Sequence, residues 1–393
     1  MNTQAQPNSL EQFCAAENHQ WRSRDLERTE RVFFSPQTPE ATIDEEDVLL
    51  FASSNYLGLA TDQRVIAAAQ KAAKEYGAGS GGSRLTTGTQ QLHQALESDI
   101  AEFLGAEDSI FFATGYQANL STIAAVAGPD TLIISDELNH ASIIDGARLA
   151  KAQVAVFPHG NLHELEQLLA SRVQPHALIV SDGLFSMHST YADVAGIQSL
   201  ATRYQAWTMI DDAHAIGTVG KRGRGCVDLY GFLPDLLIGT ASKALGAEGG
   251  FVVARQPIIH YLRNRARSYI FSTAPSPITV ASVRAALHIV RDHPELVHQL
   301  QNNARFLSTV LTEAGLLSRP LDTPIIPVPI GHSAQALAVS EKLRDAGFFA
   351  PAIRYPTVKE EEAIIRITVM ATHRTEQLRR LADELISILR SPR

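Results

Sequence analysis

The chain has 393 residues, of which 45% are hydrophobic and 19% charged, and its formal net charge is −8. This composition is typical of a folded globular protein rather than a disordered chain, and 393 residues can form one large domain with a smaller one. The acidic balance argues against a general nucleic-acid-binding protein.

The two cysteines, Cys14 and Cys226, are too few for a disulfide framework and show no zinc-ligand spacing. The polar N-terminus lacks the apolar core of a signal peptide. No apolar run reaches the roughly 18–20 residues that a membrane helix needs. We therefore expect a cytoplasmic protein that binds neither nucleic acid nor a membrane and has no metal site.

Residues 1–48 form a polar N-terminal segment, in which we expect a helix followed by an irregular or two-stranded stretch. Asp62 is a suitable N-cap for a helix that ends at Gly77. A second helix is expected over residues 90–104. Further helix-like stretches, such as 162–170 and 197–204, separate short apolar runs. These runs, the predicted strands, are residues 109–113, 131–135, 154–157, 177–181, 206–210, 236–239 and 251–254.

Apolar strands that alternate with amphipathic helices predict an α/β fold with a mostly parallel sheet covered on both faces. We assign this large domain to residues 49–285. The pattern then changes, and residues 286–393 are predicted to form a small C-terminal α+β domain. Its expected elements are strands at 325–330 and 364–369 and helices at 334–346 and 375–389.

Functional side chains in such sheets gather where the parallel strands end. The run 206–210 leads directly into Asp211, Asp212, Ala213 and His214, and the run 236–239 leads into Thr240 and then Lys243. A lysine just beyond a buried strand is costly unless it is paired or covalently used. An amine that forms a Schiff base, with an acid to hold a pyridinium nitrogen protonated, fits pyridoxal 5′-phosphate (PLP). Each residue taken alone has a simpler interpretation: Asp211 could cap the segment that follows it, and Lys243 could be exposed to solvent.

Two further positions fit the same cofactor. The run 109–113 passes through Thr114, Gly115 and Tyr116 into a helix-like stretch, and free amides at a helix N-terminus bind phosphate. His140 follows the run 131–135, where its flat ring could lie against a cofactor ring. Each feature is weak alone, because most strand-to-helix turns bind nothing and most single histidines are structural.

Two patterns resemble sites but are interpreted otherwise. Residues 77–82 match the spacing G-x-G-x-x-G, but a helix precedes them instead of a strand, so we reject a dinucleotide site. His159 and His163 are four residues apart without a second ligand cluster, and Asn161 between them looks like an N-cap. We interpret them as a loop and a helix start.

Beyond these single positions, the chain resembles the α-oxoamine synthases, fold-type I PLP enzymes that condense an amino acid with an acyl thioester and release carbon dioxide. The resemblance covers most of the chain in order. The matching stretches are SSNYLGLA (53–60), GAGSGGSRLTTGT (77–89), DELNHASIIDGARL (136–149), DGLFSM (182–187), IDDAHAIGTVGKRGRG (210–225), GTASKALG (239–246), FSTAPSP (271–277) and IRITVMATH (365–373).

The resemblance implies a role for each matching residue. Lys243 would carry the cofactor, Asp211 would bind its ring nitrogen and His214 its ring oxygen. His140 would stack on the ring, with Ser186 close to it. The phosphate would be held by Gly115, Tyr116 and Thr240, and by Ser272 and Thr273 of a second subunit, which implies a homodimer with a shared active site. Asn55 and Arg366 would bind the amino-acid carboxylate.

Within the family, two segments favour the branch that makes 8-amino-7-oxononanoate, carbon dioxide and a free thiol in biotin biosynthesis. They are Arg354 with its neighbours in 352–358 and the arginine-rich stretch with Arg22 and Arg24. The substrates would be L-alanine and pimeloyl-CoA or a pimeloyl-carrier protein, with Arg22 and Arg354 near the acyl donor. Ala215 and the turns at 187–189 and 359–362 depart from that branch. Glycine C-acetyltransferase, another α-oxoamine synthase and a non-catalytic protein on this fold remain alternatives.

Overall fold

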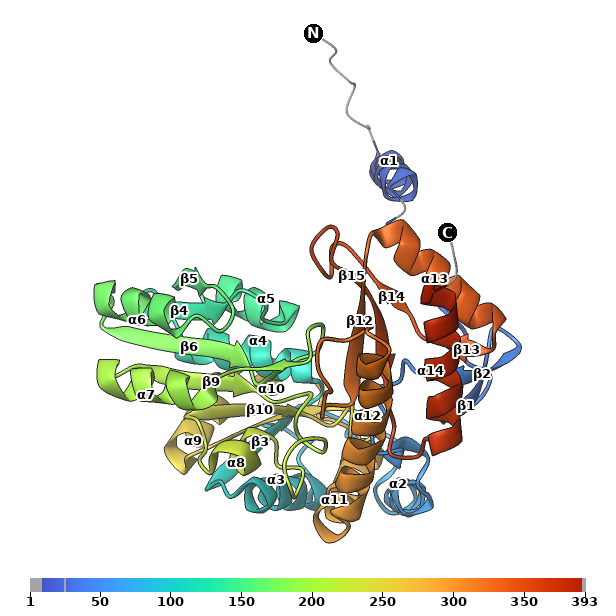
Figure 1. Cartoon of the computed structure of the whole chain (residues 1–393). Helices are drawn as coiled ribbons and strands as arrows, with labels where there is room; N and C mark the ends of the chain where they lie inside the picture. Colours follow the sequence, from blue (N-terminus) through green and yellow to red (C-terminus); the bar gives the residue numbers. More distant parts are fainter. Residues whose placement is uncertain (1–8, 25, 391–393) are drawn as a thin grey trace.

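The structure is a computed structural model that describes residues 9–24 and 26–390. Two bodies lie side by side in Figure 1, a large α/β domain and a smaller domain that contains the C-terminus. Among the described helices, none is long and apolar enough to cross a membrane.

The large domain is built on a seven-stranded sheet with the order β3-β11-β10-β9-β6-β4-β5. Its strands coincide with the seven predicted ones to within about a residue. Only β11 runs antiparallel to its neighbours β10 and β3, so the expected mostly parallel sheet is confirmed. The strands are β3 (Asp108–Phe112), β4 (Thr131–Asp136), β5 (Gln153–Phe157), β6 (His176–Asp182), β9 (Trp207–Asp211), β10 (Leu236–Thr240) and β11 (Gly250–Ala254).

Helices cover both faces of this sheet because successive strand residues point to opposite sides. Met209 belongs to one apolar cluster and its neighbour Ile210 to the other. The first cluster lies under α4 (Gly115–Val126), α5 (Ala141–Leu149), α9 (Gln256–Arg265) and α10 (Arg267–Ile270). The second lies under α3 (Gln91–Leu104), α6 (Leu162–Ser171), α7 (Val194–Tyr204), α8 (Cys226–Tyr230) and α11 (Pro277–Asp292).

The predicted helix ends rest on capping contacts. Asp62 accepts a hydrogen bond from the Arg64 amide at the start of α2 (Gln63–Tyr76), and Gly77 ends that helix. Gly105 ends α3 in the left-handed conformation, with φ at 72°, which favours glycine. Asn161 caps α6 through the Glu164 amide, as the sequence indicates.

The smaller domain contains two three-stranded sheets. One is antiparallel, β12 (Ile325–Gly331), β15 (Ala363–Thr368) and β14 (Ala352–Ile353). The other joins β1 (Glu40–Ile43) and β2 (Glu46–Leu50) to β13 (Phe348–Phe349), so part of the N-terminal segment belongs to this domain. Its helices are α12 (Glu295–Glu313), α13 (Ser333–Asp345) and α14 (Thr375–Arg390).

Two features bear on the expected domain limits. The limit after residue 285 falls inside α11, a continuous helix from Pro277 to Asp292. In the N-terminal segment, α1 (Leu10–Ser23) has no buried residue and stands apart from both domains in Figure 1. The remaining small elements are a 3-10 turn at Leu59–Thr61 and the hairpin β7 (Leu184–Phe185) with β8 (Thr190–Tyr191).

Candidate active site

Most of the predicted cofactor residues line one cavity of about 260 Å³. It lies at the carboxyl edge of the sheet, where β9 ends at Asp211 and β10 at Thr240. The strands therefore gather side chains that are more than a hundred residues apart in the sequence. The predicted residues around the cavity are Gly115, Tyr116, His140, Ser186, Asp211, His214, Thr240 and Lys243.

Lys243 is the amine at this cavity. It follows β10 by three residues and is half-buried. Burial lowers the pKa of Lys243 to about 8, with a further contribution from the Arg366 charge, while Asp211 and Asp182 act in the opposite direction. A larger share of this lysine is therefore a neutral, nucleophilic amine near pH 7–8 than of an exposed lysine.

Asp211 is held in a fixed orientation at the end of β9. Asn119 of α4 donates its side-chain amide to Oδ2 at 2.5 Å, and the Ala213 backbone amide donates to Oδ1 at 2.9 Å. Asn119 also donates to the Ser142 hydroxyl at 2.9 Å. Because Asp211 is buried and both oxygens accept a bond, this carboxylate is fixed for a partner in the cavity.

His140 lies at the N-terminus of α5, where Nδ1 accepts the Ser142 amide at 3.3 Å. The His140 amide donates to Oδ2 of Asp182 at 3.2 Å. Burial lowers the pKa of His140, and the charge of Lys243 lowers it further, against the effect of Asp211. Burial and the Asp211 carboxylate raise the pKa of Asp182 well above its ordinary value. His140 is thus favoured as a neutral ring, and its backbone is tied to a carboxyl group on β6.

A second set of contacts joins the small domain to the cavity. The Tyr56 hydroxyl hydrogen-bonds Nδ1 of His214 at 2.9 Å. Arg366 of β15 donates through Nε to the Ser186 carbonyl at 3.2 Å. Burial lowers the pKa of His214 well below its ordinary value, and the nearby charges of Lys243 and Arg366 add to this effect. Arg366 therefore brings a positive charge to the group of Tyr56, His214 and Lys243.

The start of α4 forms a cradle for an anion. Thr114 accepts the Gln117 amide through Oγ1 at 3.1 Å, which leaves the first-turn amides of Gly115 and Tyr116 for a ligand. A Cβ on Gly115 would lie 3.2 Å from Oγ1 of Thr240, and one on Gly250 only 2.4 Å from the Gly115 Cα. Two glycines thus let the helix N-terminus approach β10 and β11 closely.

Six predicted residues lie outside this cavity lining, namely Arg22, Asn55, Ser272, Thr273, Arg354 and Arg366. Ser272 and Thr273 follow α10, and Thr273 forms an isolated bridge with Ser83. Asn55 is buried, donates to the Gln37 carbonyl at 3.1 Å and accepts the Ala60 amide at 3.1 Å. Arg354 is half-buried on the turn between β14 and β15.

Arg22, on α1, is exposed and forms an ion pair with Glu27 at 2.8 Å. Two of the predicted substrate-binding arginines, Arg366 and Arg22, therefore lie in different environments. Arg366 is tied to the cavity through Ser186, while Arg22 is on a helix without buried residues. The assignment of Arg22 to the acyl donor stays a prediction.

Among the residues that line the cavity but were not singled out in the sequence are Asn119, Ser142 and Asp182. Asn119 is the fifth residue of α4 and reads as an ordinary polar helix residue. Asp182 offered a signal, since it ends a predicted buried strand as Asp211 does. Tyr56, whose hydroxyl hydrogen-bonds His214, lies in the stretch 53–60, which only the family resemblance indicated.

His159 has a structural environment. Its ring lies between Oδ2 of Asp136 at 3.0 Å and Oγ1 of Thr190 at 3.1 Å, with Phe185 edge-on at 4.3 Å between centroids. No cluster of possible metal ligands occurs among residues 9–24 and 26–390. The ring thereby connects the β7–β8 hairpin to the end of β4. Ser186 lies in the turn of that hairpin.

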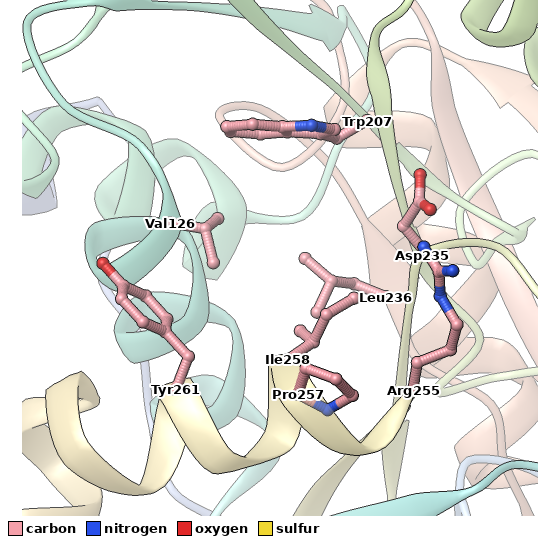
Figure 2. Close-up of a pocket in the computed structure, with 8 residues that line it drawn as sticks. All are labelled: Val126, Trp207, Asp235, Leu236, Arg255, Pro257, Ile258 and Tyr261. Carbon is pink, nitrogen blue, oxygen red and sulfur yellow. The ribbon is translucent and has the colours of Figure 1, made fainter.

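A larger cavity of about 440 Å³ lies at the opposite edge of the sheet (Figure 2). Trp207 begins β9 and Leu236 begins β10, so this cavity is one strand length, about 17 Å, from the carboxyl edge. Figure 2 shows Val126, Ile258 and Tyr261 around an apolar space, with the charged groups of Asp235 and Arg255 to one side. The first turn of α9 lines this cavity, but no lysine or histidine does, so the amine and imidazole groups of the predicted chemistry lie at the other cavity.

Comparisons with known proteins agree with this geometry. A family model described as aminotransferase class I and II matches residues 46–385. An 8-amino-7-oxononanoate synthase of Lysinibacillus sphaericus is 45% identical over 90% of this chain and 92% of its own length. The predicted resemblance to that branch is confirmed.

A biotin biosynthesis bifunctional protein BioWF of Corynebacterium kroppenstedtii is 43% identical over 94% of this chain. The match covers 57% of that protein, so the chain spans little more than half of this bifunctional relative. Among solved structures, a serine palmitoyltransferase of S. paucimobilis with a bound PLP–myriocin aldimine has a TM-score of 0.91 and 29% identity, over 98% of this chain and 99% of its own. This likeness confirms the fold-type I prediction. The chain belongs to the aminotransferase class I and II family.

Proposed function

We propose that the chain is a PLP-dependent acyltransferase that condenses L-alanine with a pimeloyl thioester, giving 8-amino-7-oxononanoate, carbon dioxide and a free thiol. The observation that carries this proposal is the convergence of Lys243, Asp211 and His140 on one cavity beside a helix N-terminus. The relatives named 8-amino-7-oxononanoate synthase, at 42% identity in Bacillus subtilis and 45% in Lysinibacillus sphaericus, support the substrate class.

The residues present fit PLP. The amides of Gly115 and Tyr116, with the Thr240 hydroxyl 3.2 Å from a Cβ that Gly115 lacks, suit a phosphate group. Asp211, held by Asn119, suits a protonated ring nitrogen, and Lys243 supplies the amine for a covalent bond to the aldehyde. When bound, PLP supplies a ring that accepts electrons from the carbon next to the substrate nitrogen.

The chain's own groups would then bind substrate and move its protons. Lys243, with its pKa lowered to about 8, would take the α-proton of L-alanine as a base near neutral pH. The guanidinium of Arg366, whose charge acts on His214 and Lys243, is the cation for the amino-acid carboxylate. His214, favoured as neutral by burial, can share a hydrogen bond with Tyr56 and still face the cavity.

The proposal includes a homodimer. Ser272 and Thr273 do not line the cavity of their own chain, which is compatible with a role at the phosphate of a second subunit. The exposed apolar side chains Leu85, Phe271 and Ile144, at 55%, 70% and 40% exposure, provide surface for such an interface.

The alternative activities share the same cavity and differ in their substrates. Glycine C-acetyltransferase would use glycine and acetyl-CoA. The structurally similar serine palmitoyltransferase is named for serine and a palmitoyl group. A non-catalytic protein on this fold would need neither the amine nor its acid partner. The intact Lys243 and Asp211 favour an enzyme.

A substrate matrix tests the proposal. Purified holoenzyme is assayed for thiol release with L-alanine, glycine and L-serine, each paired with pimeloyl-, acetyl- and palmitoyl-CoA. We expect the highest kcat/KM for L-alanine with pimeloyl-CoA. A preference for glycine with acetyl-CoA would reject the biotin-pathway assignment, and a colourless protein without turnover on any pair would reject the enzyme.

A further inference from the structure

A basic pocket that the proposed chemistry does not use lies between the two domains. Its cavity of about 610 Å³ is lined by the glycine-rich loop after β9 and by α12. The loop supplies Lys221, Arg222 and Arg224, and α12 supplies His298 and Arg305. This loop is the GKRGRG stretch of the sequence, to which the cofactor site gives no role.

The backbone of the loop is held from several sides. Gln301 of α12 donates to the carbonyls of Thr218 and Gly220, both at 3.0 Å. His298 shares a contact of 3.2 Å with the Lys221 carbonyl, and the Arg222 amide donates to Oδ2 of Asp228 at 2.7 Å. The loop is therefore ordered by its backbone, and the charged ends of Lys221 and Arg222 form no ion pair with a carboxylate of the described residues.

Its glycines could not be replaced without moving that backbone. Gly220 and Gly225 have φ of 85° and 62°, in the left-handed region. A Cβ on Gly220 would lie 2.2 Å from the Asp228 Cβ, and one on Gly225 would lie 2.2 Å from Oδ2 of Asp212. The backbone that carries the loop's cations is thus tightly packed.

The charges around the pocket are unbalanced. Its four cationic side chains face two carboxylates, whereas the whole chain carries −8. Both carboxylates are already engaged: Asp228 pairs with Arg224 at 2.7 Å, and Asp322 accepts the Tyr191 hydroxyl at 3.2 Å. Within the described residues, no carboxylate forms an ion pair with Lys221, Arg222 or Arg305.

We propose that this basic pocket binds the phosphate groups of an organic phosphate or polyphosphate. Arginine guanidinium groups bind phosphate through paired hydrogen bonds, and a fixed loop lowers the entropy cost of arranging them. A single carboxylate ligand would leave part of this excess charge unmatched. The pocket is separate from the cradle at α4, since the two share no lining residue.

The phosphate can come from two sources. One is the carrier part of the acyl thioester, in which case the inference rests on the proposed function. The position of the loop favours this source, because it follows His214 of the catalytic cavity by six residues, and Thr218 between them donates to the His214 carbonyl at 2.6 Å. The other source is a free polyphosphate that has no part in the reaction.

The test measures binding to the holoenzyme by titration calorimetry with CoA, pyrophosphate and pantetheine, which has no phosphate. The test variant is Arg222→Glu with Arg305→Glu. The control is Lys74→Glu with Lys342→Glu, which makes the same charge change on exposed positions of α2 and α13. Arg222→Gln with Arg305→Gln removes the cations without reversing them, in case the first variant folds poorly.

We expect CoA or pyrophosphate to bind the test variants at least tenfold more weakly than wild type and control, with pantetheine unchanged. A loss for CoA alone identifies the acyl carrier, and a loss for pyrophosphate as well identifies a general phosphate site. Equal affinity in wild type and test variants, an equal loss in the control, or no binding of either phosphate by wild type would overturn the inference. Turnover is measured separately, so failure of the proposed function is distinguishable from failure of this site.

Discussion

Asn119 donates its side-chain amide to Oδ2 of Asp211 over 2.5 Å, across the gap between α4 and β9. The same helix presents its N-terminal amides to the cavity, so α4 links the acid expected at the ring nitrogen with the cradle expected at the phosphate. The position of α4 therefore determines the distance between the two ends of the cofactor site.

Replacing Asn119 by alanine should weaken PLP binding by roughly tenfold or more, since a hydrogen bond to a charged group contributes about 1.5–3 kcal/mol. Equilibrium dialysis of PLP against the apoenzyme measures this affinity. Gln117→Ala, on the same helix, is the control. Unchanged affinity in Asn119→Ala would mean that Asp211 does not need this donor.

Asp211→Asn should reduce turnover far more than Asp212→Asn, because only Asp211 lines the cavity. An asparagine cannot hold a ring nitrogen protonated by charge. Asp212 is buried behind it and accepts the Cys226 amide at 2.6 Å. Steady-state kcat of both variants with saturating PLP decides the point. Equal losses would show that the two carboxyl groups have been assigned the wrong roles.

Asp212 also predicts a pH effect on stability. Burial raises its pKa from 3.8 to about 6, so the folded state holds the proton more tightly than the unfolded state. The resulting stabilisation is present below about pH 4 and is lost as the pH rises through 6. The unfolding midpoint of wild type, measured relative to Asp212→Asn, should therefore fall between pH 4 and pH 6. A constant difference over that range would contradict the burial effect.

Arg22→Ala should raise the Michaelis constant for pimeloyl-CoA by about tenfold to a hundredfold and leave that for L-alanine nearly unchanged. The reason is a charge-assisted bond from Arg22 to the far carboxylate of the donor, which must replace the exposed pair with Glu27. Arg24→Ala is the matched control two residues away. Equal Michaelis constants in wild type and both variants would remove α1 from substrate binding.

The sequence predicted the large domain well, because each buried strand is a short apolar run bounded by turn residues. The tips of β9 and β10 could likewise be located, and with them Asp211 and Lys243. The helix α11 was missed, since its residues 277–292 coincide with the expected change of domain. The pairing of β2 with β13, some 300 residues later, has no local signal.

The sequence predicts a cavity residue when its position at the end of a strand places it there. It does not predict one that reaches the cavity through the packing of separate elements. Asn119 meets Asp211 only because α4 packs on the sheet beside the end of β9, which joins residues 92 apart in sequence. Asn55, whose role at the substrate stays a prediction, hydrogen-bonds the Gln37 carbonyl and the Ala60 amide. Hydrogen bonds of this kind depend on the tertiary arrangement, which no local pattern encodes.

The central claim is that Lys243 holds PLP covalently, and it has a direct chemical test. The holoenzyme is treated with sodium borohydride, digested and analysed by peptide mass spectrometry, with Lys243→Ala as the control. The account predicts a reduced phosphopyridoxyl group on the peptide that contains Lys243, and in Lys243→Ala a folded protein with neither this group nor turnover. A phosphopyridoxyl group on another lysine, or more than a few per cent of wild-type turnover in Lys243→Ala, would contradict it.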